Sequence, residues 1–146
     1  RWSVVASNEC NQQPPNMNIA INQEATRLQT LLKFTYGLVP IAAGADKFTN
    51  ILTDWSGYLA PGLAGMLPFD PATFMMVVGV IEIVAGILVL MRPAIGAYVV
   101  AGWLVAIALT LLFGWHHVDV AVRDLVMAVG AFALARLSHV LVTTAK

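Results

Sequence analysis

Residues 72–114 read ATFMMVVGVIEIVAGILVLMRPAIGAYVVAGWLVAIALTLLFG, two apolar runs joined by the dipeptide Arg92-Pro93. A bilayer core of ~30 Å requires ~20 apolar residues in a helix, because a helix satisfies its own backbone hydrogen bonds in lipid. Each run is long enough to cross. The segment therefore predicts a helical membrane protein, with one ionisable residue, Glu82, in the middle of the first run.

The composition of the whole chain agrees with this prediction. Of 146 residues, 59% are hydrophobic and 11% are charged, whereas soluble domains carry about 25% charged residues. The length suits one small helix bundle. The net charge is zero, no basic stretch indicates a nucleic-acid partner, and the one cysteine, Cys10, excludes an internal disulfide or a CxxC redox pair.

Two further apolar runs, at 31–48 and 118–137, complete a set of four. The turns near residues 92 and 115–118 are short, so neighbouring helices must run antiparallel. We therefore predict an all-α fold, an antiparallel four-helix bundle with spans near 28–48, 72–91, 94–114 and 119–138, a polar segment 1–27, an outer loop 49–71 and a tail 139–146. Within the polar segment, Met17 is an alternative start of the chain.

The basic residues set the predicted orientation. Four spans place both termini and the turn at residue 92 on one side, together with Arg27, Lys33, Arg92, Arg136 and Lys146. The opposite side carries Lys47 and Arg123 near the spans. Since basic residues concentrate on the cytoplasmic side, we expect a multi-pass protein of the bacterial inner membrane with both termini in the cytoplasm.

The outer loop contains a set of apolar residues that would share one helical face: Ile51, Leu52, Trp55, Tyr58 and Leu59. Trp and Tyr favour the membrane–water interface, so one interpretation is a short helix that lies on the membrane. The alternative is an ordered loop that caps the bundle. Within the spans, small residues recur at spacings that favour close helix packing, at Gly37 and Gly44, Gly79 and Gly86, Gly102 and Ala106, and Ala131 and Ala135.

Glu82 is the first candidate functional residue. Ten residues from Ala72 at about 1.5 Å each place it ~15 Å deep, near the bilayer midplane. An ionised carboxylate there costs about 3 kcal/mol on insertion scales, so Glu82 should face the bundle interior, either protonated or paired with a cation. One interpretation is proton handling or a polar anchor for a quinone-like head group. The other is a structural hydrogen bond between helices.

A second group of polar residues is predicted at the outer ends of the spans: Asp46, Lys47, His116, His117, Asp119, Arg123 and Asp124. Asp119 and Arg123 stand four residues apart, so they share a helix face and can pair. Arg123 could also reach Asp46 or Glu82. The alternative interpretation of the group is a solvated rim with one structural ion pair.

The same residues argue against a metal or haem centre. Adjacent His116 and His117 would point ~100° apart on a helix and do not form the i,i+4 chelating pair of metal sites. Trp103 lies near the middle of its span, where its N–H can donate to a partner in the bundle or its ring can stack on a ligand, and the favoured alternative is packing alone. We therefore expect no metal, and we treat Glu82 and Trp103 as candidate contacts for a bound quinone or lipid.

Gly44-Ala45-Asp46-Lys47-Phe48 at the end of the first span, and Val80-Ile81-Glu82-Ile83-Val84-Ala85-Gly86-Ile87-Leu88 in the second, resemble the DoxX-like family of small bacterial membrane proteins. The resemblance covers about 28–138. It implies a four-helix membrane fold in which Glu82, and with less weight Lys47, are functional. The family is named for a small subunit associated with thiosulfate:quinone oxidoreduction, and other relatives are linked to membrane oxidative-stress complexes.

The favoured hypothesis is therefore an accessory subunit, not catalytic alone, that packs against a larger membrane redox complex or a second copy of itself, in contact with membrane lipids. One alternative is a quinone-linked oxidoreductase component that uses Glu82 for proton handling. A small transporter or channel is the third, although the sequence has no broken helix or inverted repeat of the kind that transporters use.

Overall fold

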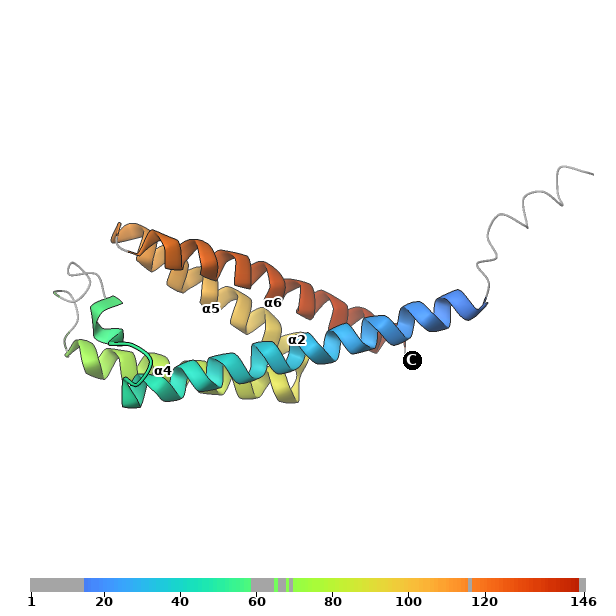
Figure 1. Ribbon diagram of the computed structural model, residues 1–146, viewed down its shortest axis with the longest axis horizontal. Helices are drawn as coiled ribbons and strands as arrows, with labels where there is room; N and C mark the ends of the chain where they lie inside the picture. Colours follow the sequence, from blue (N-terminus) through green and yellow to red (C-terminus); the bar gives the residue numbers. More distant parts are fainter. Residues whose placement is uncertain (1–14, 59–64, 66–67, 69, 116, 145–146) are drawn as a thin grey trace, which may run out of the picture.

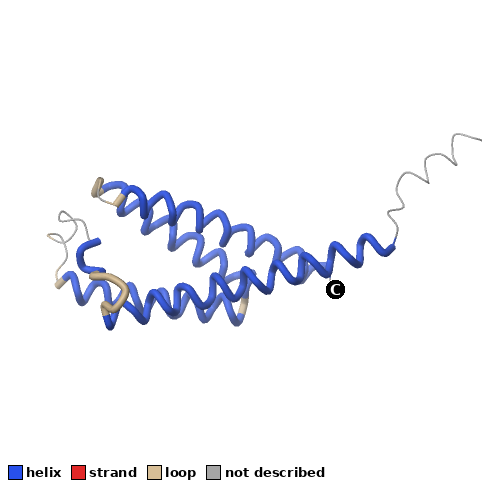
Figure 2. Tube along the Cα trace, in the orientation of Figure 1, coloured by secondary structure: helices blue, strands red, loops and turns tan. Residues whose placement is uncertain are grey.

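The computed structural model describes residues 15–58, 65, 68, 70–115 and 117–144, and its elements are helical (Figures 1 and 2). They are α2 (Pro15–Thr49), the 3₁₀ turn η1 (Trp55–Tyr58), α4 (Pro71–Met91), α5 (Pro93–Phe113) and α6 (Val118–Thr144). No strand occurs in these described ranges. The all-α prediction is confirmed.

Three of the helices, α4, α5 and α6, are long and apolar enough to cross a membrane. This agrees with a multi-pass membrane protein. Helix α2 is not among the three, since its sequence is more polar and carries Lys33, Asp46 and Lys47 within its apolar part. The predicted fourth crossing therefore stays a prediction.

The helix ends follow ordinary capping chemistry. Asp70 precedes α4, and its carboxylate accepts a hydrogen bond from the backbone N–H of Ala72 at 3.2 Å. Pro71 and Pro93 open α4 and α5, where a missing N–H costs nothing. Arg92 alone separates the two helices, with φ −137° and ψ 79°, because a residue before proline avoids the helical region. The short turn predicted at this point is confirmed.

Two helices extend beyond the predicted spans. Helix α2 begins at Pro15 rather than near 28, because the Asn- and Gln-rich stretch contains no glycine or further proline to interrupt a helix before Gly37. Met17 therefore lies inside a helix, and residues 1–14 lie outside the described part. Helix α6 likewise continues to Thr144, through most of the predicted tail.

Between α2 and Tyr58, the described part of the predicted outer loop forms less helix than the interpretation of a short membrane-surface helix required. A single 3₁₀ turn, Trp55–Tyr58, is present, while Ile51 and Leu52 lie outside it and are 81% and 75% exposed. Leu59 lies outside the described residues. Both interpretations of the remainder of the loop stay predictions.

The helices pack as two pairs, α2 with α4 and α5 with α6. In Figure 1 the pairs lie closest near the α4–α5 turn and diverge toward the end that carries η1. Glycines bring α2 against α4: a Cβ atom added to Gly44 would lie 2.5 Å from the carbonyl oxygen of Gly79, and one added to Gly86 would lie 2.5 Å from that of Gly37. The predicted close packing is confirmed for these four glycines.

Small and branched residues join the two pairs. Val89 of α4, Ala97 of α5 and Leu134 of α6 are fully buried in one cluster, which also includes Ala131 and Ala135. The hydroxyl of Tyr36 in α2 donates to the carbonyl of Met127 in α6 at 2.9 Å, and Gln29 donates to the buried Ser138 at 3.1 Å. Large apolar side chains cover the outside of all four helices, as a surface facing lipid requires. Gly102 and Ala106 lie on this outer surface and make no helix contact of the predicted kind.

A candidate charged site inside the bundle

An ion pair between Lys47 and Glu82 links α2 to α4. The Nζ atom of Lys47 lies 2.7 Å from Oε2 of Glu82, and the two side chains are 5% and 11% exposed. Sequence reasoning expected Glu82 to face the interior, either protonated or paired with a cation, and the structure pairs it. The partner is Lys47, not Arg123.

The direction of side chains on antiparallel helices explains why these two meet. The Cα–Cβ bond of a helical residue tilts toward the N-terminus of its helix. Lys47 therefore leans back into the bundle, and Glu82, on the opposing helix, leans toward the η1 end. Gly44 leaves the room between them, because a Cβ atom there would lie 3.2 Å from Cβ of Glu82. Gly44 and Lys47, both at the end of α2, thus both contact α4.

The other helix pair adds one residue from each of its helices. Asp124 of α6 is 8% exposed and interacts electrostatically with Arg123 beside it on α6, with Lys47 and with Glu82. The indole N–H of Trp103 in α5 interacts with the Glu82 carboxylate. Its distance and angle do not meet those of a formed hydrogen bond. We call Lys47, Glu82, Trp103 and Asp124 the charged cluster, since it unites all four helices around three ionisable groups.

The turn after α2 covers this cluster. The Nζ atom of Lys47 lies 3.9 Å from the centre of the Trp55 ring, a cation–π contact. The indole N–H of Trp55 in turn donates to Oδ2 of Asp46 at 2.7 Å. Oδ1 of Asp46 accepts from the backbone N–H groups of Ile51 and Leu52 at 3.1 and 3.0 Å. Asp46 therefore organises the turn and holds Trp55 over Lys47.

A second aromatic contact connects this turn to the other helix pair. The Tyr58 ring lies 5.8 Å from Trp55 and 4.6 Å from the ring of His117, between centroids. His117 and Trp115 adopt left-handed backbone angles, with φ of 57° and 51°. These values are uncommon outside glycine. The tight α5–α6 turn thereby brings the imidazole of His117 to the loop before α4.

The predicted outer polar group is thus divided by the structure. Lys47 and Asp124 join Glu82, Asp46 binds the turn, and His117 stacks on Tyr58. Asp119 and Arg123 are exposed, and no ion pair joins them to each other or joins Arg123 to Asp46 or Glu82 within the described residues. The predicted Arg123 pairings are wrong. His116 lies outside the described residues.

The sequence predicted that Trp55 lies at the membrane–water interface, whereas the structure places its ring over the Lys47 ammonium group. Its distance of eight residues from Lys47, across a turn rich in polar residues, gave no sign that the ring would return over the ammonium group. Among the described residues, no group of three or more His, Cys, Asp or Glu side chains could hold a metal ion.

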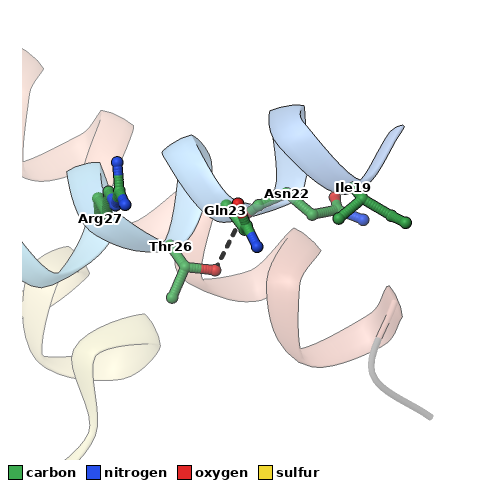
Figure 3. Close-up of a pocket in the computed structure, with 5 residues that line it drawn as sticks. All are labelled: Ile19, Asn22, Gln23, Thr26 and Arg27. Carbon is green, nitrogen blue, oxygen red and sulfur yellow. Dashed lines mark hydrogen bonds between the residues drawn. The ribbon is translucent and has the colours of Figure 1, made fainter. Parts of the chain in front are cut away.

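A shallow hollow lies elsewhere, on the N-terminal part of α2 (Figure 3). Its lining residues all belong to this one helix: Ile19, Asn22, Gln23, Thr26 and Arg27. Thr26 donates to the carbonyl oxygen of Asn22 at 2.8 Å, an internal helix contact. A hollow formed by a single helix encloses nothing, so we place no site there.

Comparisons with protein-family models, with curated proteins and with solved structures find no match to this chain.

Proposed function

We propose that this chain is a DoxX-like membrane subunit whose charged cluster takes up and releases a proton for a larger membrane redox complex. The observation that carries the proposal is the burial of two acids, Glu82 and Asp124, around a single base, Lys47. Ionisable groups at membrane depth are costly and are functional by default.

The charge balance supports proton exchange rather than a purely structural ion pair. With all three groups ionised, the buried groups would carry one net negative charge in a region of low dielectric constant, because the other cation that acts on Asp124, Arg123, is exposed on α6 and is screened by its surroundings. Uptake of one proton by either acid removes that charge, and a lysine between two carboxylates lets the proton reside on either of them. A purely structural ion pair would need only Lys47 and Glu82, and it gives no reason for a second buried acid, Asp124.

The position of α2 supports a fourth membrane crossing. Gly37 and Gly44 of α2 contact Gly86 and Gly79 of α4, so that residues 37–49 run beside a helix apolar enough to span. With four crossings, both termini lie on the same side of the inner membrane, and the basic residues favour the cytoplasm.

In this proposal the redox chemistry belongs to a larger complex to which the chain binds. The single cysteine, Cys10, allows no disulfide within this sequence, and the exposed apolar surface of the helices suits an accessory subunit that contacts lipids and a larger complex. A quinone-linked role, with Glu82 and Trp103 near a head group, is the second candidate, which the unfilled donor on Trp103 favours.

Infrared difference spectroscopy tests the proton exchange. The purified protein in lipid is exposed to a pH step, and the C=O band of protonated carboxyl groups is recorded for the wild type, Glu82→Gln, Asp124→Asn and Asp119→Asn. We expect Glu82→Gln and Asp124→Asn to remove or displace the band. Asp119→Asn, an exposed acid on the same helix as Asp124, is the matched control. A band that all variants share unchanged would contradict the proposal.

Native mass spectrometry after gentle extraction from the native membrane tests the subunit role. We expect this chain to appear within a heteromeric complex that contains a redox enzyme. A chain that remains alone or self-associated in every mild detergent contradicts the accessory role, and leaves the proton exchange to be judged by its own experiment.

A further inference from the structure

The charged cluster contains a buried hydrogen-bond donor that the surrounding side chains leave unfilled. The Nε1 atom of Trp103 is buried and has no hydrogen-bond partner in the described structure. Buried N–H groups in native proteins almost always have a partner, which is protein, water or a ligand. The donor acts on the Glu82 carboxylate, so it belongs to the charged cluster.

An unfilled acceptor lies in the same cluster. Asp124 is 8% exposed, yet within the described ranges its carboxylate accepts no hydrogen bond and forms no ion pair at contact distance. Its charge interactions with Arg123, Lys47 and Glu82 act at distances beyond an ion pair. Glu82 uses Oε2 for Lys47, which leaves Oε1 as a second acceptor. Glu82 interacts with both Trp103 and Asp124, so a donor from α5 and acceptors from α4 and α6 border the region between the helix pairs.

We infer that a hydroxyl group occupies this region, accepting from the indole N–H of Trp103 and donating to the carboxyl groups of Asp124 or Glu82. The chemistry selects this class of ligand. An indole N–H disfavours a bare cation, and two carboxyl groups disfavour an anion. A hydroxyl accepts and donates at once. It can come from a water molecule or from the head group of a hydroxyl-bearing amphiphile that enters from the lipid.

The role of this hydroxyl in proton transfer rests on the proposed function, in which Glu82 and Asp124 exchange a proton. A hydroxyl between Asp124 and Glu82 connects two acids that do not hydrogen-bond to each other directly. It supplies a short chain of hydrogen bonds along which a proton can be relayed from one acid to the other, without any change in oxidation state. The Trp103 N–H orients the hydroxyl so that its own proton faces the carboxyl groups.

The experiment compares the wild type with Trp103→Phe in lipid nanodiscs, and Trp115→Phe serves as the matched control because Trp115 is 85% exposed. Infrared spectra in ordinary and heavy-oxygen water detect a bound water by the isotope shift of its O–H band. Native mass spectrometry of protein taken from its own membrane detects a retained amphiphile. We expect one of these two signals in the wild type and in Trp115→Phe, and its loss in Trp103→Phe.

A second variant guards against misfolding of Trp103→Phe. Asp124→Asn keeps the side-chain shape and weakens the acceptor, so it should shift the isotope-sensitive band or reduce the adduct severalfold. Absence of both signals from the wild type, or a signal that Trp103→Phe leaves unchanged, overturns the inference. If the carboxyl band still responds to Glu82→Gln in that case, proton exchange stands without the hydroxyl, so the two failures are distinguishable.

Discussion

At Lys47, three groups act on one ammonium ion: the Glu82 carboxylate, the face of the Trp55 ring and, at longer range, Asp124. The lysine is the only base in the charged cluster, and it is 6% exposed. Its removal would leave Glu82 without a cation and Asp124 with only the exposed Arg123. This is the residue on which the electrostatics of the site depend.

Substitution of Lys47 by methionine should therefore destabilise the bundle by about 3 kcal/mol, the usual cost of breaking a buried ion pair by removing one partner. The double variant Lys47→Met, Glu82→Leu should recover most of that loss, because it removes both charges. Reversible unfolding in mixed micelles measures both. Arg123→Met, at an exposed site on α6, is the control and should change stability little. Equal losses in the single and double variants would argue that packing, not charge, holds the site.

Glu82 was predictable from sequence because a lone carboxyl in an apolar run must face inward. Asp124 was harder to place, and helix geometry shows why. Asp119 and Arg123 lie about 40° apart around α6 at 100° per residue, whereas Asp124 lies about 140° from Asp119. Asp119 and Arg123 therefore share an outward face, as their spacing predicted, and Asp124 alone turns inward. Spacing within one helix could not reveal which face meets the neighbouring pair.

At the scale of the elements, backbone contact between α2 and α4 positions the ion pair. A methyl group on Gly44 would meet the Gly79 carbonyl at 2.5 Å and Cβ of Glu82 at 3.2 Å. Backbone atoms cannot yield without separating the helices. Even one methyl group added at Gly44 should therefore weaken the packing of α2 against α4.

Gly44→Ala should destabilise the protein by roughly 1–3 kcal/mol through overpacking. Gly102→Ala is the matched control, since a Cβ atom there meets nothing within 4 Å. Alanine favours a helix over glycine, so the control should be neutral or stabilising by up to about 1 kcal/mol. The same unfolding assay compares them. Similar effects of the two substitutions would contradict the close contact of α2 with α4.

The turn between α2 and η1 depends on Asp46. Asp46→Ala removes the acceptor of two backbone N–H groups and of the Trp55 indole. We expect hydrogen exchange at residues 51–58 to accelerate at least about tenfold, which corresponds to about 1.4 kcal/mol of lost protection. Exchange within α5 should stay unchanged. Mass spectrometry of peptides from residues 50–58 measures the effect, and unchanged exchange there would mean that Asp46 does not order the turn.

The extent of α2 illustrates where sequence patterns stop being informative. Its polar N-terminal half contains no helix-breaking residue, but polar composition resembles a loop as much as a solvated helix. The 3₁₀ turn at 55–58 was equally hard to predict, because its position depends on the Asp46 carboxylate and the Lys47 ammonium, which are contacts made only in the folded chain.

For the whole molecule, the number of crossings decides the orientation of the termini. If α2 crosses beside α4, both ends of the chain lie on the same side of the membrane. If only α4, α5 and α6 cross, the ends lie on opposite sides. Reporter fusions that are active on one side of the membrane, placed after residue 146 and at residue 15, should both report the cytoplasm. Opposite locations would contradict the four-span arrangement.

The most direct test of the central claim is solid-state NMR of the protein in lipid bilayers, with the side-chain carboxyl carbons of Glu82, Asp124 and Asp119 recorded across a pH series. The account predicts that Glu82 and Asp124 together retain one proton at a pH at which exposed Asp119 has lost its own, and that Lys47→Met alters both signals. Full ionisation of Glu82 and Asp124 in step with Asp119 would contradict it, and would leave Lys47–Glu82 as a structural ion pair.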